Sequence, residues 1–120
     1  MTSQLYREHI LDLWKNPLNF GDLPSATHQH KELNSLCGDE IEMQLKVENS
    51  IIKEIKFKGR GCAISIASAS ILTESLKNQK LEKAEELSNK ELLEKLKIPL
   101  SPARIKCALI SLDALKGAVK

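Results

Sequence analysis

The sequence contains few aromatic residues, no long apolar run and no excess of one charge. Aromatic side chains make up 3% of the 120 residues, so no row of rings is available on which nucleic-acid bases could stack. No stretch approaches the roughly 20 apolar residues that span a bilayer, and polar residues interrupt the amino-terminal apolar positions, unlike those of a signal peptide. We therefore expect a cytoplasmic protein that binds neither nucleic acid nor a membrane.

Length and charge balance favour one domain without an electrostatically marked surface. The 18 basic and 16 acidic residues give a net charge of +2, and both signs are spread along the chain. No basic block therefore predicts a nucleic-acid groove or an anionic membrane patch. At 13.4 kDa the chain can form one modest core but is too short for two ordinary domains. Residues 1–120 are predicted to form a single domain.

Cysteine is scarce and odd in number, with three residues at widely separated positions. An odd count leaves one thiol unpaired, which argues for a reduced, intracellular protein. Taken singly, each cysteine could be a small buried hydrophobe, and no Cys-x-x-Cys pair forms a local metal site. Their settings point elsewhere: Cys37 lies two residues before Asp39, Cys62 follows a Gly-Arg-Gly turn, and Cys107 has Lys106 beside it. Three thiols and one carboxylate are the material for a metal site that the fold must assemble.

The first half of the chain predicts a helix, a loop and a hairpin. Residues 6–14 carry apolar side chains at helical spacing, and this helix ends at Asn16 and Pro17. Residues 17–36 show no convincing period and predict a loop with at most one short strand. Residues 41–47 alternate apolar and polar side chains, the pattern of a strand buried on one face. Asn49 and Ser50 then form a turn, and the β-branched run 51–57 is its antiparallel partner.

The second half predicts helices. Residues 63–77 form one that begins directly after Cys62, so helix-start amides and the helix dipole would favour a thiolate there. A short helix covers residues 80–87. The pair Ser88 and Glu91 has the form of a capping box that opens the next helix. Ser101 as cap and Pro102 at the first position begin the last helix.

The last helix is predicted to bury one apolar stripe, which consists of Ile105, Leu109, Leu112 and Val119. Cys107 lies roughly 200° around the helix from Ile105, at 3.6 residues per turn. It should therefore face away from the middle of the core, at an exposed helix start. Together these elements predict an α+β fold, in which a small antiparallel sheet carries helices packed on one side.

Four segments closely resemble the iron–sulfur cluster assembly proteins of the NifU/IscU/SufU type. They are residues 15–19 (KNPLN), 37–39 (CGD), 57–70 (FKGRGCAISIASAS) and 102–108 (PARIKCA). Their order and spacing match as well, and the resemblance covers essentially the whole chain. The sequence is therefore identified as a member of the family of the NifU N-terminal domain, with the SufE/NifU-like (IscU-like) architecture that this implies.

The resemblance implies a scaffold rather than an enzyme. Such a scaffold receives sulfur from a cysteine desulfurase, binds iron, a [2Fe–2S] cluster or zinc, and delivers its cargo to apo iron–sulfur acceptor proteins as a monomer or weak homodimer. The implied ligands are Cys37, Asp39, Cys62 and Cys107. A carboxylate is a harder ligand than a thiolate and releases soft metals more easily, which suits a site that must give up its cargo. Cys107 is the implied persulfide acceptor, with basic neighbours that favour its thiolate.

Two branches of the family stay open. IscU-type scaffolds usually carry His before the third cysteine, where this chain has Lys106, and residues 64–70 and 104–107 look like SufU. SufU-type proteins, however, typically carry an insertion between the second and third cysteines, for which the spacing of Cys62 and Cys107 leaves no room. We predict a scaffold that builds and transfers a cluster. The alternative is a zinc-dependent, SufU-like partner that accepts persulfide sulfur.

Other candidate residues are left out of the predicted site. His28 and His30 lie in a polar loop, where histidines are common without metal. Tyr6 and Trp14 belong to the helical stripe and are expected in the core or an interface. The charged run 77–97 is expected to be a solvated helical surface, and no paired base and nucleophile indicates a Cys/His hydrolase.

Overall fold

The computed structural model describes residues 3–35, 38–97 and 99–120, without the side chains of residues 3, 4 and 6. The elements in chain order are α1 (Ser3–Lys15), β1 (His28–Asn34), β2 (Asp39–Glu48), β3 (Ile51–Arg60), α2 (Ala63–Leu76), α3 (Leu81–Glu86), α4 (Asn89–Leu96) and α5 (Pro102–Val119).

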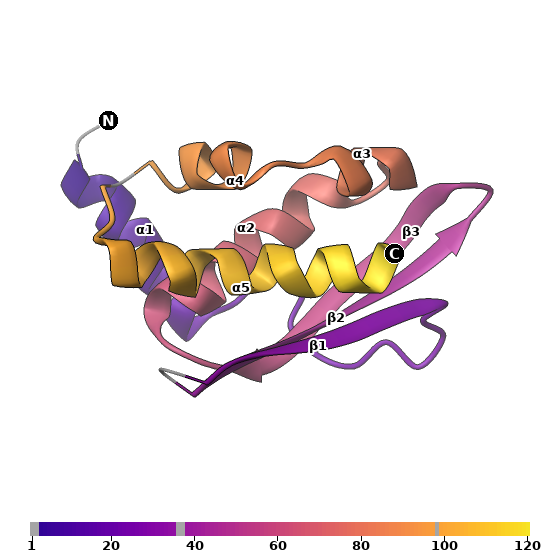
Figure 1. The fold of residues 1–120 in the computed structure, drawn as a ribbon, viewed down its shortest axis with the longest axis horizontal. Coiled ribbons are helices and arrows are strands. Elements are labelled where there is room, and N and C mark those ends of the chain that lie inside the picture. Colours follow the sequence, from indigo (N-terminus) through magenta and orange to yellow (C-terminus); the bar gives the residue numbers. More distant parts are fainter. Residues whose placement is uncertain (1–2, 36–37, 98) are drawn as a thin grey trace.

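The strands form one antiparallel sheet in the order β1-β2-β3, and α2 and α5 lie together on one side of it (Figure 1). This confirms the predicted α+β class. The predicted hairpin is also present, since β2 and β3 pair around Asn49 and Ser50. Both turn residues have positive φ, 53° and 62°, which is the backbone of the tight turns that suit the twist of a hairpin.

Strand β1 is longer than the sequence indicated. All seven of its residues pair with β2, with His30 opposite Met43, whereas we expected a loop with at most one short strand. Its sequence, HQHKELN, contains one apolar residue, so no hydrophobic alternation marks it. Backbone pairing with β2 and the cover of α5 create this strand, and neither is visible in a local pattern.

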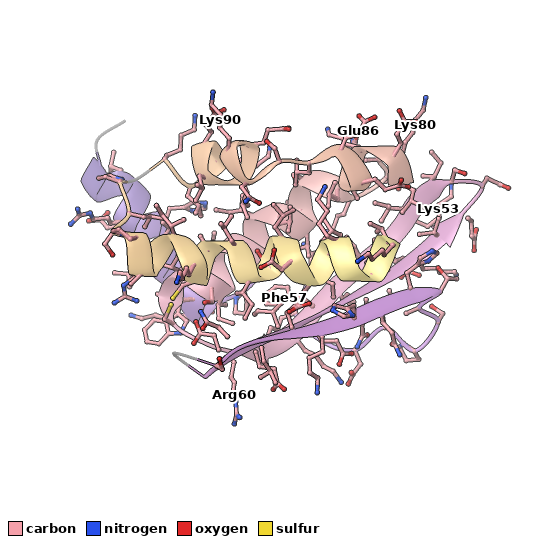
Figure 2. The ribbon with its side chains drawn as sticks, viewed as in Figure 1. Lys53, Phe57, Arg60, Lys80, Glu86 and Lys90 are labelled. Carbon is pink, nitrogen blue, oxygen red and sulfur yellow. The ribbon has the colours of Figure 1, made fainter. Side chains whose placement is uncertain are left out.

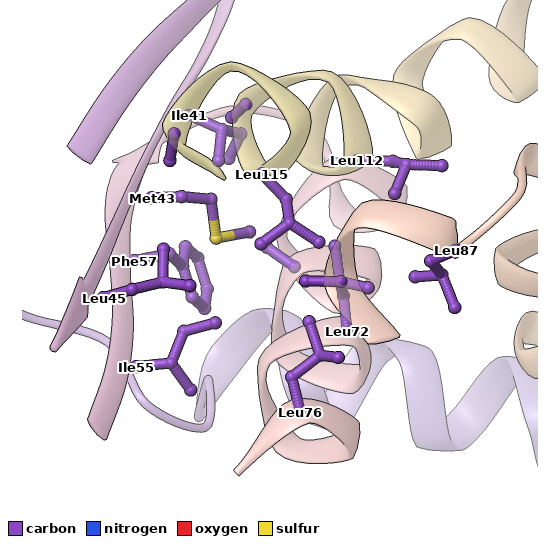
Figure 3. Close-up of a cluster of buried hydrophobic side chains, with 14 of the residues drawn as sticks. Ile41, Met43, Leu45, Ile55, Phe57, Leu72, Leu76, Leu87, Leu112 and Leu115 are labelled. Atoms are coloured by element: carbon purple, nitrogen blue, oxygen red, sulfur yellow. The ribbon is translucent and has the colours of Figure 1, made fainter. Parts of the chain in front are cut away.

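The main core lies between the sheet and the two long helices. Strand β2 contributes Ile41, Met43 and Leu45, as predicted from the alternation of residues 41–47, and strand β3 contributes Ile55 and Phe57. They meet Leu72 and Leu76 of α2 and Leu112 and Leu115 of α5 (Figure 3). Fully burying each such side chain contributes about 1.5–3 kcal/mol, so this cluster holds the layers together.

A second cluster of buried side chains joins α1 to the starts of α2 and α5. It consists of Ile10, Leu13, Ile64, Ala67, Leu96, Cys107 and Ala108. The predicted stripe of α1 therefore packs through Ile10 and Leu13, but Trp14 is 46% exposed and is not a core residue. The side chain of Tyr6 lies outside the described residues.

Helix α5 buries a wider face than a single stripe. Leu112 is buried as expected, but Ile105, Leu109 and Val119 are only partly covered. Ile110, Ala114 and Leu115 are buried instead, along with further residues of the same helix. The reason is that α5 contacts β1 and β2 on one side and α2 on another, so two surfaces of the helix face protein.

The predicted helix starts and the solvated surface are confirmed. Ser88 and Glu91 form the capping box of α4, and the Ser101 side chain accepts from the Arg104 amide at the start of α5. The charged run over α3 and α4 is largely exposed, and Lys80, Glu86 and Lys90 point away from the body of the molecule (Figure 2). These ends and surfaces follow from local chemistry.

Candidate metal centre

Strand pairing brings Asp39 to the residues that precede α2. Asp39 is the first residue of β2, and the next residue, Glu40, pairs with Arg60, the last residue of β3. The chain then turns through Gly61 into Cys62. The carboxylate of Asp39 is consequently 5% exposed and lies against this turn, although 23 residues separate Asp39 from Cys62 in the sequence (62 − 39).

Cys62 is the cap residue of α2, as predicted from the Gly-Arg-Gly turn. Its backbone is extended, with φ −72° and ψ 171°, and its sulfur lies 3.6 Å from the hydroxyl oxygen of Ser65. Burial alone would raise the pKa of the Cys62 thiol. Hydrogen bonds from the hydroxyl and amide of Ser65, from Cys107 and from the Ile64 amide outweigh burial and lower that pKa below its ordinary value.

Cys107 lies in the second turn of α5 and is 7% exposed. As predicted, it stands apart from the main core, but the expectation of an exposed helix start is wrong, because Cys107 packs in the second cluster with Ile64 and Ala108. The preceding residues Arg104 and Lys106 are exposed. The second cluster also contains Ile10 and Leu13 of α1 and Leu96 of α4, and the periodicity of α5 alone does not reveal that these elements meet near Cys107.

The ligand atoms of Asp39, Cys62 and Cys107 all lie within 4.8 Å of one another. The ligand atoms of a tetrahedral zinc or iron centre stand about 3.3–3.8 Å apart, given metal–ligand distances near 2.0–2.3 Å. Small side-chain rotations would bring these three to one ion, and their thiolate and carboxylate chemistry suits zinc or iron. The predicted fourth ligand, Cys37, lies outside the described residues.

The structure adds Ser65, to which the sequence analysis assigned no role. Its side chain is fully buried, and its hydroxyl donates to Oδ2 of Asp39 at 2.5 Å. The same oxygen lies 3.2 Å from the carbonyl oxygen of Cys107 and 3.6 Å from Sγ of Cys62. The sequence did contain one indication of this role. Ser65 follows the helix cap Cys62 by three positions, and residues three apart lie on the same side of a helical turn.

Gly61 was also missed as a site residue. A Cβ atom on Gly61 would lie 3.0 Å from Cγ of Asp39 and 3.0 Å from Cβ of Ser65. Such contacts are tighter than ordinary van der Waals contact. The absence of a side chain at this position therefore lets the Asp39 carboxylate pack beside the start of α2.

The histidines that were left out of the predicted site lie on β1. His30 Nε2 is 2.7 Å from Oε1 of Glu32, and His28 Nδ1 is 2.8 Å from Oγ1 of Thr27. Among the described residues, Asp39, Cys62 and Cys107 are the group of metal-binding side chains that converge. Within the same residues, no helix is both long and apolar enough to cross a membrane.

Comparison with known proteins identifies relatives over nearly the whole chain. Residues 5–120 match the model of the NifU-like N terminal domain. The chain is 36% identical to the iron–sulfur cluster assembly scaffold protein IscU of Haemophilus influenzae, a match that covers 95% of this chain and 92% of the relative. It is 37% identical to IscU of Azotobacter vinelandii, with 96% and 91% covered.

Solved structures share the fold. A crystal structure described as that of a hypothetical protein superposes with a TM-score of 0.81, at 30% identity and 98% coverage of both chains. A protein named as an iron–sulfur cluster assembly scaffold of the SUF system, from Fervidobacterium islandicum AW-1, superposes with a TM-score of 0.79, at 26% identity and 100% coverage of both.

Proposed function

The chain belongs to the family of NifU-like N-terminal domains, and we propose that it is a scaffold on which an iron–sulfur cluster is assembled and from which the cluster is delivered. Curated relatives named IscU scaffold proteins match over nine-tenths of the chain. The observation that carries the proposal is the convergence of two thiols and one carboxylate, from Asp39, Cys62 and Cys107, within 4.8 Å.

The cargo would be iron or a [2Fe–2S] unit held by the proposed ligands Cys37, Asp39, Cys62 and Cys107. Thiolates bind cluster iron well, whereas a carboxylate is a harder and more easily exchanged ligand. Asp39 is thus the proposed point at which an acceptor protein begins ligand exchange. The lowered pKa of Cys62 supports its proposed role as a metal ligand, since only the thiolate form of cysteine binds a metal.

The sulfur would come from the persulfide of a cysteine desulfurase, with Cys107 as the proposed acceptor. Its thiolate would attack the terminal sulfur of the desulfurase persulfide, form a new S–S bond and release the desulfurase cysteine as a thiolate. Because the Cys107 side chain is 7% exposed, this attack requires some opening of the second cluster. Cys62 is more accessible, so mapping the persulfide to one of the two cysteines tests the assignment.

The runner-up is a SufU-like partner that uses the same four residues to hold zinc and accepts persulfide sulfur without building a cluster. These residues would hold the zinc ion as thiolates and carboxylate, and one of the cysteines would accept the persulfide sulfur. The structural similarity to a SUF-system scaffold favours keeping this alternative. In both cases the protein partners are a cysteine desulfurase and apo iron–sulfur acceptors. The scaffold would not be an enzyme, whereas the SufU-like partner would have a sulfurtransferase-like activity.

The deciding experiment is anaerobic incubation of the purified protein with ferrous iron, cysteine and a cysteine desulfurase. We expect visible absorption of a cluster, followed by its transfer to an apo-ferredoxin. The Cys62→Ser and Cys107→Ser variants are expected to form no stable cluster. Because serine is close to cysteine in size, this loss would reflect the missing thiolate rather than altered packing. Retained zinc together with a persulfide, without a transferable cluster, would overturn the scaffold and favour the sulfur-transfer partner.

A further inference from the structure

Ser65 connects the candidate ligands to one another. Its hydroxyl oxygen lies 2.5 Å from Oδ2 of Asp39, 3.2 Å from the carbonyl oxygen of Cys107 and 3.6 Å from Sγ of Cys62. The Ser65 side chain is fully buried and Asp39 is 5% exposed. Water therefore has little access to this hydroxyl or to the carboxylate oxygen that it contacts.

The hydroxyl has one proton to share among these atoms. Donation to a carboxylate is charge-assisted and produces the shortest hydrogen bonds, which matches the 2.5 Å distance to Asp39. The Cys62 thiol can donate its proton to the Ser65 oxygen, and an ionised Cys62 competes with Asp39 for the hydroxyl proton across the longer distance of 3.6 Å. When Cys62 ionises, the amides of Ile64 and Ser65 still face its sulfur. The hydrogen bond to Asp39 is thus the main interaction of the Ser65 hydroxyl.

We propose that Ser65 is a positioning residue that controls how readily the centre releases its metal, an inference that rests on the proposed function of the site. By holding Oδ2, the hydroxyl leaves Asp39 one oxygen for the metal. It also gives the carboxylate a hydrogen-bond partner in the metal-free state, when the metal no longer neutralises its charge. Asp39 can therefore leave the metal without becoming an unpartnered buried carboxylate.

Removing the hydroxyl should slow metal release. Without Ser65, the metal-free state would retain a buried carboxylate that has lost a hydrogen bond, while the metal-bound state would keep its charge neutralised. The balance then shifts toward the bound state. The same reasoning holds for zinc and for iron, because both would draw on the Asp39 oxygen.

Ser68 provides a matched control. It is one turn further along α2, is equally buried, and its hydroxyl has no hydrogen-bond partner among the described residues. Ser65→Ala and Ser68→Ala therefore remove the same atom from the same helix. They differ in that only Ser65→Ala removes contacts with the candidate ligands, of which the hydrogen bond to Asp39 is the shortest.

The test loads zinc as the probe metal and measures its release to a colorimetric chelator. Ser65→Ala is expected to release zinc about tenfold more slowly than the wild type. A factor of ten corresponds to the lower end of the range of free energies found for hydrogen bonds to charged groups. Ser68→Ala is expected to release it at the wild-type rate. In an Asp39→Ala background, Ser65→Ala should change the rate no further, because the residue through which it acts is gone.

Release from Ser65→Ala that is unchanged or faster than in the wild type would overturn the inference, as would an effect that persists in the Asp39→Ala background. Ser65→Thr retains a hydroxyl and should release zinc as the wild type does; slow release from this variant would assign the effect to packing. The proposed function is tested separately, on the wild type alone. It fails if the wild type does not retain zinc through its cysteines or does not transfer a cluster, whatever the Ser65 variants do.

Discussion

Gly117 of α5 allows the imidazole ring of His30 on β1 to pack directly against the helix. A Cβ atom on Gly117 would lie 2.2 Å from Cδ2 and 2.6 Å from Nε2 of His30. A glycine inside a helix costs about 1 kcal/mol relative to alanine, so helix stability alone does not account for it here. This contact lets β1 approach the helix that carries Cys107.

Gly117→Ala should therefore destabilise the protein in spite of its better helix propensity. The new methyl group would push the His30 ring aside, and overpacking of this kind costs about 1–3 kcal/mol. The gain of about 1 kcal/mol in helix propensity offsets part of this cost, so the free energy of unfolding, measured in urea, is expected to fall by at most about 2 kcal/mol. With His30→Ala in the background, the same substitution should be neutral or stabilising. An equal loss in both backgrounds would mean that the ring is not the obstacle.

Asp39→Ala should separate the behaviour of zinc from that of a cluster. Zinc loses a direct oxygen ligand, so its affinity is expected to fall by more than the roughly 10–100-fold that removing an outer-shell partner costs. A bound cluster keeps its thiolates but loses the ligand at which exchange begins, so its transfer should slow. Chelator titration measures the first effect, and the decay of visible absorption with apo-ferredoxin measures the second. If neither changes, Asp39 is not a ligand.

Gly61→Ala should impair metal binding more than folding. Its Cβ would stand 3.0 Å from Cγ of Asp39, so we expect the carboxylate to shift and zinc affinity to fall about 10–100-fold. The free energy of unfolding without metal should change by less than about 1 kcal/mol.

Gly59→Ala is the contrasting variant, two residues earlier in the chain. Gly59 has φ +145°, and its Cβ would lie 2.0 Å from the backbone oxygen of Glu40. Because the backbone cannot move aside cheaply, the free energy of unfolding should fall by about 3 kcal/mol or more. Equal destabilisation by the two glycine substitutions, or full zinc affinity in Gly61→Ala, would contradict this distinction.

Asp113→Asn should raise stability at neutral pH. Asp113 is exposed, but partial desolvation of its carboxyl by neighbouring atoms, together with the charge of Glu32, raises its pKa above the ordinary value. Below an unfolded-state pKa of about 3.9 the carboxyl group is protonated in both the folded and the unfolded state, so it does not lower the free energy of unfolding. As the pH rises through the higher folded-state pKa, the native carboxylate is penalised and stability is lost. The melting temperature of the variant should thus exceed that of the wild type at pH 7, and the difference should shrink toward pH 3. A difference that is constant with pH would rule out this cause.

Local patterns in the sequence predicted most of the elements. The alternation of residues 41–47, the turn at Asn49 and the capping box at Ser88 each correspond to observed structure. These signals succeed because turns and caps depend on residues within a few positions of one another. Strand β1 lacked such a signal, since an edge strand with mostly polar side chains is held by its neighbours.

Four features could be read from the amino-acid sequence alone: the helix starts, the hairpin, the family resemblance and the set of candidate ligands. How these parts meet depends on the tertiary structure. The pairing of Glu40 with Arg60 brings Asp39 to Cys62, and the packing of α5 on the sheet and α2 buries Cys107 beside them. The contact between Ser65 and Asp39 arises in the same way. Such contacts depend on strand register and helix packing, which sum interactions over the whole chain and leave no periodic trace at the residues themselves.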